Sequence, residues 1–290
     1  MHTYIHTHKY LHSLQLIGMV SFPLKYLFSK QSLTYIYIYI IYIGDKLIDI
    51  ISSDNSAQIL LYLRYQDSNG DIGLHNGVPL MLDGLEIHTS WRNGPACAHI
   101  NGKMAIVTSD EEDQVHLYYR LDNYNLIDGG KMVLRDPKTG KLHNIGPVNY
   151  LKAGATGRLK YTLCDFNDDG HLDLILGTNG YHAIPSPELN GLPACVNGTL
   201  ACKDNGATVL VLLQNASATT ASAIVFEWPL WLTTKGYRVS YGGQELGVAP
   251  VISTDGGGVL EGLILATPGG RHVFWAMEDL GLSSTEPPLR

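Results

Sequence analysis

Oxygen-bearing side chains recur at alternate positions in one short segment of the chain, residues 165–173. A hard cation such as calcium takes roughly six to eight oxygen ligands, so the chain must curl around it, and a glycine permits the sharp turn. Gly170 stands where that turn is needed. The spacing therefore predicts a calcium loop, whose ligands are the side chains of Asp165, Asn167, Asp169 and Asp173 and the backbone carbonyl of His171.

The sequence around this loop indicates strands on both sides of it. An EF-hand loop starts in the same way, but a Glu at its twelfth position closes it and a helix stands on each side. Here the closing carboxylate, Asp173, is the ninth residue, and the apolar run 174–177 follows. A metal-free turn is the alternative, because Asp, Asn and Gly favour turns on their own account. Four carboxylates within nine residues repel one another unless a cation intervenes, which favours the calcium site.

The composition is typical of a sizeable, turn-rich β protein. The chain has 290 residues, of which 45% are hydrophobic and 16% are charged, with 31 glycines against 5 phenylalanines. Its formal net charge of −7 offers no basic surface, so we expect no nucleic-acid partner. The sequence also lacks a nucleophile elbow, a paired-histidine metal motif, a phosphate loop and a dinucleotide fingerprint.

Residues 1–43 differ from the rest, because His-Thr and Tyr-Ile dipeptides recur in them as in low-complexity sequence. The apolar stretch 13–28 contains Pro23 and Lys25 and is too short and interrupted to predict a membrane span. A poor signal peptide and a misassigned start are the other interpretations, and residues 35–43 alternate in a way that suits a strand. Membrane association is therefore left open.

From residue 44 onward the chain repeats itself weakly. The segment DLILG at 173–177 aligns with DIISS at 49–53, AIVTS at 105–109 and GLILA at 262–266. In three copies an aromatic residue follows thirteen positions after the first aligned residue: Tyr62, Tyr118 and Trp275. Further strand candidates follow in each unit, at a period of roughly 50 to 90 residues, as in β-propeller blades with unequal loops. The predicted units are residues 44–90, 91–150, 155–241 and 246–280, followed by a tail at 281–290.

Residues 165–177 resemble the FG-GAP/VCBS repeat, the calcium-loop blade unit that also occurs in the N-terminal propeller of integrin α chains. The resemblance implies an all-β propeller with calcium in the turn between the first two strands of a blade. The other units depart from the ligand pattern, so we expect no metal there. Of the calcium-ligand pattern, the first unit keeps Asp45 and Asp49, and the second keeps only Asn101. The fourth unit has Thr254 followed by glycines.

The number of blades favours a part of a larger propeller. The chain offers about three and a half to four blades, with no clear outer strand after Trp275. Propellers have roughly four to eight blades. A seven- or eight-bladed parent is therefore the first interpretation, and a self-closed ring of four blades is the second.

An insertion in the third unit, residues 181–205, contains features that indicate the cellular compartment of the protein. Cys195 and Cys202 lie in it and would bridge in an oxidising environment. Asn197 begins an acceptor for N-glycosylation, and Asn215 begins a second one. These features predict an extracellular or cell-surface protein, with free thiols and chance acceptors as the alternative. Two further cysteines precede unit turns, where buried free thiols are expected: Cys97 and Cys164.

Three functions suit these features. The first is a calcium-stabilised propeller that serves as a binding or adhesion platform for a glycan or a protein. The second is the propeller part of a carbohydrate-active enzyme, such as a rhamnogalacturonan-type polysaccharide lyase. The third is a structural segment without its own ligand. We expect the first, with calcium as a structural ion and no catalysis. The residue types that would line a lyase groove occur at Trp91, Lys131, Arg158, His182 and Glu227.

Overall fold

The computed structural model describes ten ranges of the chain: residues 39–42, 48–53, 56–90, 93–145, 159–178, 207–220, 223–241, 246–253, 259–267 and 271–284. Within them the regular elements are β-strands apart from the single 3-10 turn η3 (Met277–Asp279), which confirms the all-β class. No helix in these ranges is long and apolar enough to cross a membrane.

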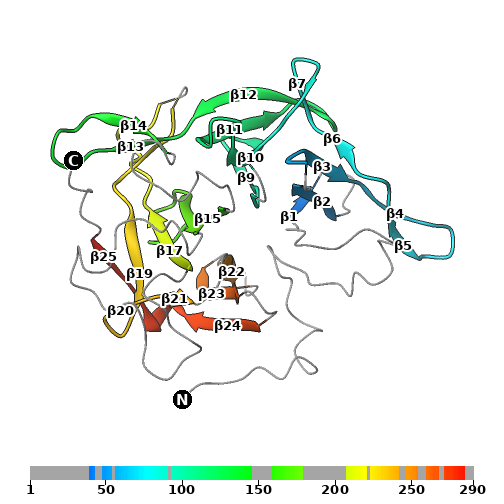
Figure 1. The fold of residues 1–290 in the computed structure, drawn as a ribbon. Helices are drawn as coiled ribbons and strands as arrows, with labels where there is room; N and C mark the ends of the chain where they lie inside the picture. The colour runs from blue at the N-terminus through cyan, green and yellow to red at the C-terminus, as the bar shows by residue number, and fades with distance from the viewer. Residues whose placement is uncertain are drawn as a thin grey trace.

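The described strands form six sheets, and four of these follow one another along the chain as antiparallel meanders. Figure 1 shows them in succession from the right of the view, over the top, to the left and then the bottom. The first consists of β1 (Tyr39–Tyr42), β2 (Ile48–Ser53), β3 (Ile59–Tyr62) and β6 (Val78–Pro79). The second contains β9 (Ala96–Ile100), β10 (Lys103–Ser109), β11 (Val115–Arg120) and β12 (Asn125–Lys131), extended by β7 (Met81–Leu82) and β8 (Leu85–Glu86).

The third and fourth sheets continue this order. The third contains β15 (Lys160–Cys164), β16 (Asp173–Gly177), β17 (Ala207–Leu212), β19 (Leu230–Thr234), β20 (Tyr237–Arg238) and β21 (Ser240–Tyr241). The fourth consists of β22 (Gly247–Ile252), β23 (Leu260–Thr267) and β24 (Arg271–Ala276). Two small sheets lie beside these. One pairs β4 (Arg64–Gln66) with β5 (Ile72–Leu74), and the other contains β13 (Val133–Arg135), β14 (Leu142–Asn144) and β18 (Val225–Phe226).

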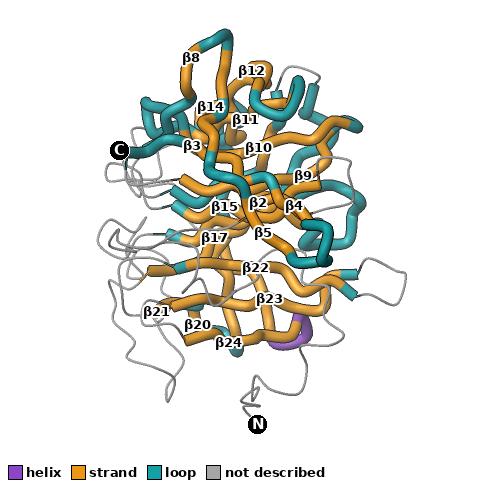
Figure 2. The backbone as a smooth tube through the Cα atoms, turned by 90° about the vertical axis from the view of Figure 1, so that its right-hand side faces the viewer, coloured by secondary structure: helices purple, strands orange, loops and turns teal. Residues whose placement is uncertain are grey.

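The sheets stack face to face in chain order. β9 lies against both β1 and β15, and β15 lies against β22. Figure 2 shows β15, β17, β22 and β23 one above another. A separate apolar core fills each junction, with Ile51 and Ile106 in the first, Val107 and Leu174 in the second, and Ile175 and Leu263 in the third.

This stacking explains why the strands of the middle sheets read as continuous apolar runs. Successive side chains of a strand point to opposite faces, so a strand covered on both faces has no polar side. In β16, Leu174 and Leu176 face the second core, while Ile175 faces the third. All six residues of β17 are buried.

The second and third strands of all four sheets pair in an equivalent register. Ile50 lies opposite Tyr62, Ile106 opposite Tyr118, and Leu263 opposite Trp275. In the third sheet Leu174 takes this place and lies opposite Leu212. Tyr62, Tyr118 and Trp275 therefore each lie opposite the residue that directly follows the first aligned residue of their own unit.

The end of the chain differs from the prediction. No strand was expected after Trp275, but β25 (Leu280–Ser284) pairs with β19 along five residues. Its Leu280 and Leu282 pack against the third core. The first residues of the predicted tail are therefore part of the third sheet. The signal was missed because the partner strand belongs to the preceding unit, which a local pattern does not reveal.

Candidate metal centre

The predicted calcium loop joins two antiparallel strands, as expected. β15 ends at Cys164, which lies opposite Asp173, the first residue of β16. The strands themselves are apolar and sit between the second and third cores. Phe166, the second loop residue, is 8% exposed and packs into the third core. The cores therefore fix both ends of a loop whose middle, residues 167–171, is exposed.

The loop curls around its own carboxylates. Asp165 accepts hydrogen bonds from the backbone N–H groups of Asp169 at 3.0 Å and Gly170 at 2.8 Å. Asp169 accepts one from the backbone of His171 at 2.9 Å and one from the Asn167 amide at 2.9 Å. Gly170 has a φ of +83°, in the left-handed region that glycine adopts without strain. The turn expected at this glycine is therefore present.

Asp173 closes the loop from inside the protein. Its side chain is fully buried, at 0% exposure. One carboxylate oxygen accepts the backbone N–H of Phe166 at 2.9 Å, and the other accepts that of Gln214 at 2.8 Å. Burial raises the pKa of Asp173 above its usual range, and the charges of Asp169 and Asp165 raise it further, although the two backbone hydrogen bonds act in the opposite direction.

The donor set fits calcium in its chemistry. All five predicted ligands offer oxygen, the atom that hard cations prefer. A cation beside Asp173 would favour its ionised form, which burial and the neighbouring carboxylates disfavour. The described residues hold no group of three or more His, Cys, Asp or Glu side chains drawn together as a metal cluster. The carboxylates of Asp165 and Asp169 instead accept hydrogen bonds from backbone N–H groups within the loop.

The equivalent positions of the first unit share the buried carboxylate of this loop, whereas those of the second unit form a different turn. Asp49, at the position of Asp173, is also fully buried, and it accepts the backbone N–H of Arg64 at 2.8 Å. In the second unit Asn101 and Gly102 form a tight turn, with φ values of +52° and +73°. Asp45 and Thr254 lie outside the described residues.

A small groove lies beside the loop and involves residues that the sequence analysis missed. It has a volume of about 200 Å³ and runs between loop residues 165–168 and Val259, Leu260 and Met277 of the fourth unit. Val259 is 53% exposed. These apolar residues come from the next unit along the chain, so no spacing within the loop indicates them.

The remaining site residues have local partners or lie outside the described ranges. Asn215 donates its amide to Glu227 and accepts the Ser217 hydroxyl at 2.8 Å. Lys131 lies on β12 and contacts Glu112 and Asp110. Cys97 and Cys164 are free thiols, as expected. Cys164 is buried, as expected, whereas Cys97 is half-buried because it lies on β9, the end strand of the second sheet. The residues outside the described ranges are Trp91, Arg158, His182, Cys195, Asn197 and Cys202.

Comparison with protein-family models gives no match, and comparison with curated proteins gives no significant match either. The resemblance of residues 165–177 to the FG-GAP/VCBS repeat therefore stays a prediction from the sequence.

Proposed function

We propose that the chain is a calcium-stabilised β-propeller segment that serves as a binding or adhesion platform for a glycan or a protein. The loop 165–173 is the observation that carries this proposal. It combines an all-oxygen donor set, a curled backbone and a fully buried closing carboxylate at the start of a core strand.

The arrangement of the sheets supports the propeller part of the proposal. Propeller blades are antiparallel meanders, and they pack face to face around a common axis. The four sheets here are successive meanders, their first strands lie side by side, and a core fills each junction. The equivalent register of the second and third strands supports a repeated unit.

Calcium would contribute charge neutralisation at the third unit. Asp165, Asn167, Asp169 and Asp173 would hold the ion with their side chains, together with the His171 carbonyl. Asp173 also accepts a hydrogen bond from the backbone N–H of Gln214, the second residue after β17. The ion would therefore stabilise the first three strands of the unit as a group. Exposed loops would then be free to contact a ligand.

An extracellular or cell-surface location belongs to the same proposal. It rests on the acceptor sequence that begins at Asn215. The Asn215 amide, to which a glycan would attach, is half-buried and donates to Glu227, so a glycan there requires this contact to open. The lyase alternative has weaker support, because Lys131 and Glu227 each have a local acidic or amide partner.

Two measurements test the proposal. Calorimetric titration with Ca²⁺, and with Mg²⁺ as the control ion, should show one calcium site and weaker magnesium binding, since Mg²⁺ demands a tighter octahedral shell. A glycan array probed with calcium and with chelator should then show binding that depends on the ion. Absence of a calcium site by titration would refute the proposal, while a calcium site without ligand binding would leave only the structural role.

A further inference from the structure

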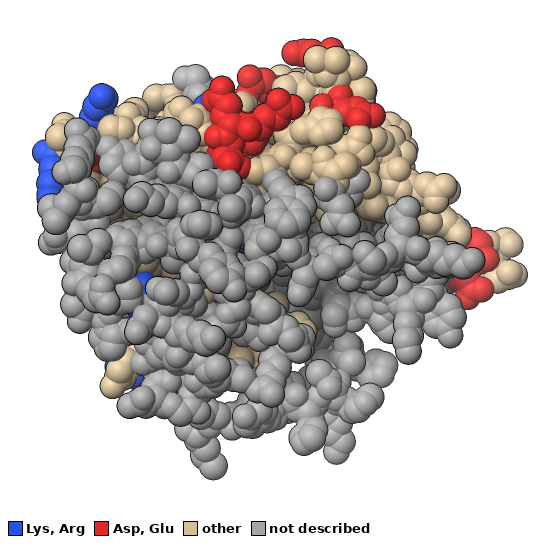
Figure 3. All heavy atoms as spheres, in the orientation of Figure 1, with Lys and Arg blue, Asp and Glu red and all other residues tan. Residues whose placement is uncertain are grey.

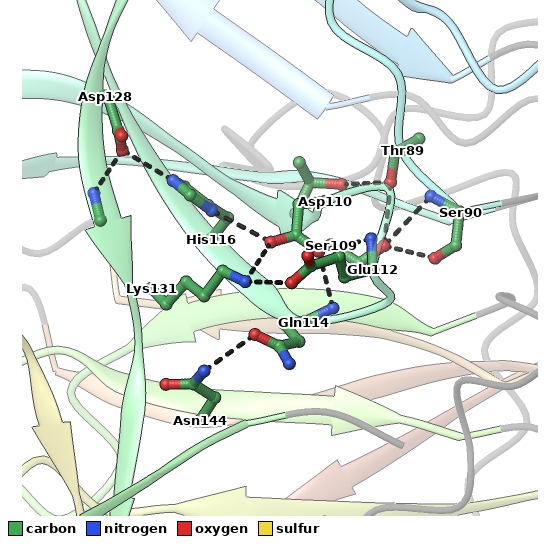
Figure 4. A network of polar contacts seen from close by, with 12 residues as sticks. Thr89, Ser90, Ser109, Asp110, Glu112, Gln114, His116, Asp128, Lys131 and Asn144 are labelled. Atoms are coloured by element: carbon green, nitrogen blue, oxygen red, sulfur yellow. Dashed lines mark hydrogen bonds and ion pairs between the residues drawn. The ribbon is translucent and has the colours of Figure 1, made fainter. Parts of the chain in front are cut away.

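A polar network separate from the calcium loop lies on the second sheet, and Figure 4 shows it from close by. His116 of β11 stands at its centre. Its Nδ1 lies 3.3 Å from Asp110, the first residue after β10, and its Nε2 lies 2.7 Å from Asp128 of β12. The imidazole therefore connects the loop 110–114 with the strand beside it.

The two contacts determine the protonation state of His116. A neutral imidazole has one N–H donor and one acceptor nitrogen, whereas an ionised carboxylate only accepts. Both contacts can be hydrogen bonds at once only when both ring nitrogens carry a proton. The ring is held in place by stacking on Tyr118, with the two ring centroids 4.6 Å apart and the planes 12° from parallel.

The charges around His116 favour the imidazolium form. The loop contributes Asp110, Glu111, Glu112 and Asp113, and β12 contributes Asp128 together with Lys131, the one basic neighbour among these described residues. Figure 3 shows acidic side chains gathered at the top of the molecule, over the region where Figure 1 draws β10 to β12. Burial alone lowers the pKa of His116, but the hydrogen bonds and charges of Asp110 and Asp128 outweigh it and raise that pKa above its ordinary value.

The loop depends on Asp110 for its shape. Asp110 accepts the backbone N–H groups of Glu112 at 2.9 Å and Gln114 at 3.0 Å. The Gln114 side chain in turn accepts the amide of Asn144 on β14 at 2.9 Å. His116 therefore contacts, through Asp110 Oδ2, the same carboxylate whose Oδ1 holds the backbone of the loop.

We infer that His116 is a protonation-controlled clamp, which as imidazolium ties the loop 110–114 to β12 and as neutral imidazole releases one of its two carboxylates. The clamp makes this side of the second sheet most stable in mildly acidic solution.

The pH window follows from the directions of the shifts. The pKa of His116 is raised in the folded protein, so its contribution is complete below the ordinary value of 6.5 and is lost as the pH rises through the folded value. The pKa values of Asp110 and Asp128 are lowered from 3.8, so their contribution is complete above that value and is lost as the pH falls through the folded values. The clamp is therefore complete between about pH 4 and pH 6.5.

The test uses the full chain with His116→Gln and Asp128→Asn, and with His99→Gln as the control at an exposed histidine of β9. In the parent, the NMR titration midpoint of His116 should lie above 6.5, and Asp128→Asn should lower that midpoint. Between pH 6 and pH 8.5 the amides of Glu112 and Gln114 should lose about tenfold in hydrogen-exchange protection, the equivalent of one hydrogen bond. His116→Gln should abolish this pH dependence, and His99→Gln should keep it.

Two results would overturn the inference. One is a His116 midpoint at or below 6.5 that Asp128→Asn leaves unchanged. The other is equal pH dependence of loop protection in the parent and in His116→Gln. If His116→Gln does not fold, the midpoints in the parent and in Asp128→Asn still decide the question.

Discussion

Asp173 accepts, through Oδ1, a hydrogen bond of 2.8 Å from the backbone N–H of Gln214, which lies 41 residues later in the chain. Gln214 follows the end of β17 by two residues. Asp49 makes the same contact in the first sheet, at 2.8 Å from the N–H of Arg64, which follows the end of β3 by two residues. A buried carboxylate at one aligned position thus anchors the end of the third strand in both units.

This contact predicts the effect of removing the Asp173 charge. In Asp173→Asn one side-chain position becomes an N–H donor that faces a backbone donor, so one buried hydrogen bond is lost. We expect the free energy of unfolding in chelator to fall by about 1–3 kcal/mol. Urea unfolding measures it, with Asp168→Asn on the exposed loop surface as the control. Equal urea midpoints for Asp173→Asn and the parent would contradict the anchoring role.

The calcium proposal predicts a different result for Asp169. Asp169→Ala removes a predicted ligand from an exposed position, so it should weaken calcium binding and lower the melting temperature in calcium buffer. With calcium at a hundredfold excess over its dissociation constant, the parent should gain about 2.7 kcal/mol, and the variant, whose dissociation constant is larger, should gain less. In chelator the two proteins should melt nearly alike. Calorimetry and thermal melts check both points, and identical melting in both buffers would count against the site.

Gly177 lies in close contact with the backbone of Leu246, at the junction of the third and fourth units. A Cβ at this position would lie 1.8 Å from the backbone oxygen of Leu246, an atom that cannot move aside as a side chain can. We expect Gly177→Ala to destabilise the protein by about 3 kcal/mol, at the upper end of overpacking effects. Gly281→Ala is the matched control, because its Cβ would meet only the Thr233 hydroxyl at 3.2 Å. Similar unfolding midpoints for the two variants would refute the close contact.

The free cysteines should resist modification in the folded protein. Cys164 is 4% exposed, and burial raises the pKa of the Cys97 thiol well above its usual value. Both should react slowly with iodoacetamide at pH 8 and rapidly in urea, because the thiolate is the reactive form. Peptide mass mapping gives the rate at each cysteine. The same map examines Cys195 and Cys202, which should be labelled only after reduction if they are bridged.

Local patterns in the sequence were sufficient for the all-β class and for the strands that flank residues 165–173. Side-chain alternation and turn residues depend on neighbours along the chain, so Tyr62, Tyr118 and Trp275 could be placed on third strands from spacing alone. The curl at Gly170 was predictable for the same reason.

Contacts between units could not be predicted in this way. β25 pairs with β19 of the preceding unit, and the groove beside the loop is completed by Val259 and Met277 of the next one. The local sequence does not single out His116, because its contact depends on Asp128, which a turn brings onto the adjacent strand. The register pairs His116 with Lys131 and Asp128 with Tyr118, with a shift between the two pairs, so regular hairpin spacing does not indicate the contact.

The separation of the interior into three cores has a consequence for how the protein unfolds. Among the described residues, the first core lies between the first two sheets and the third core between the last two. The second core lies between the second and third sheets and also includes Leu134 and Phe226 of the small sheet that contains β14. Loss of an end sheet therefore exposes one core and leaves the other two covered. The free energy of unfolding is then approximately the sum of one contribution from each sheet and one from each contact between neighbouring sheets. Denaturation is therefore expected to begin at a terminal layer and advance inward, with the layer that bears the Asp165–Asp173 hairpin among the last to melt.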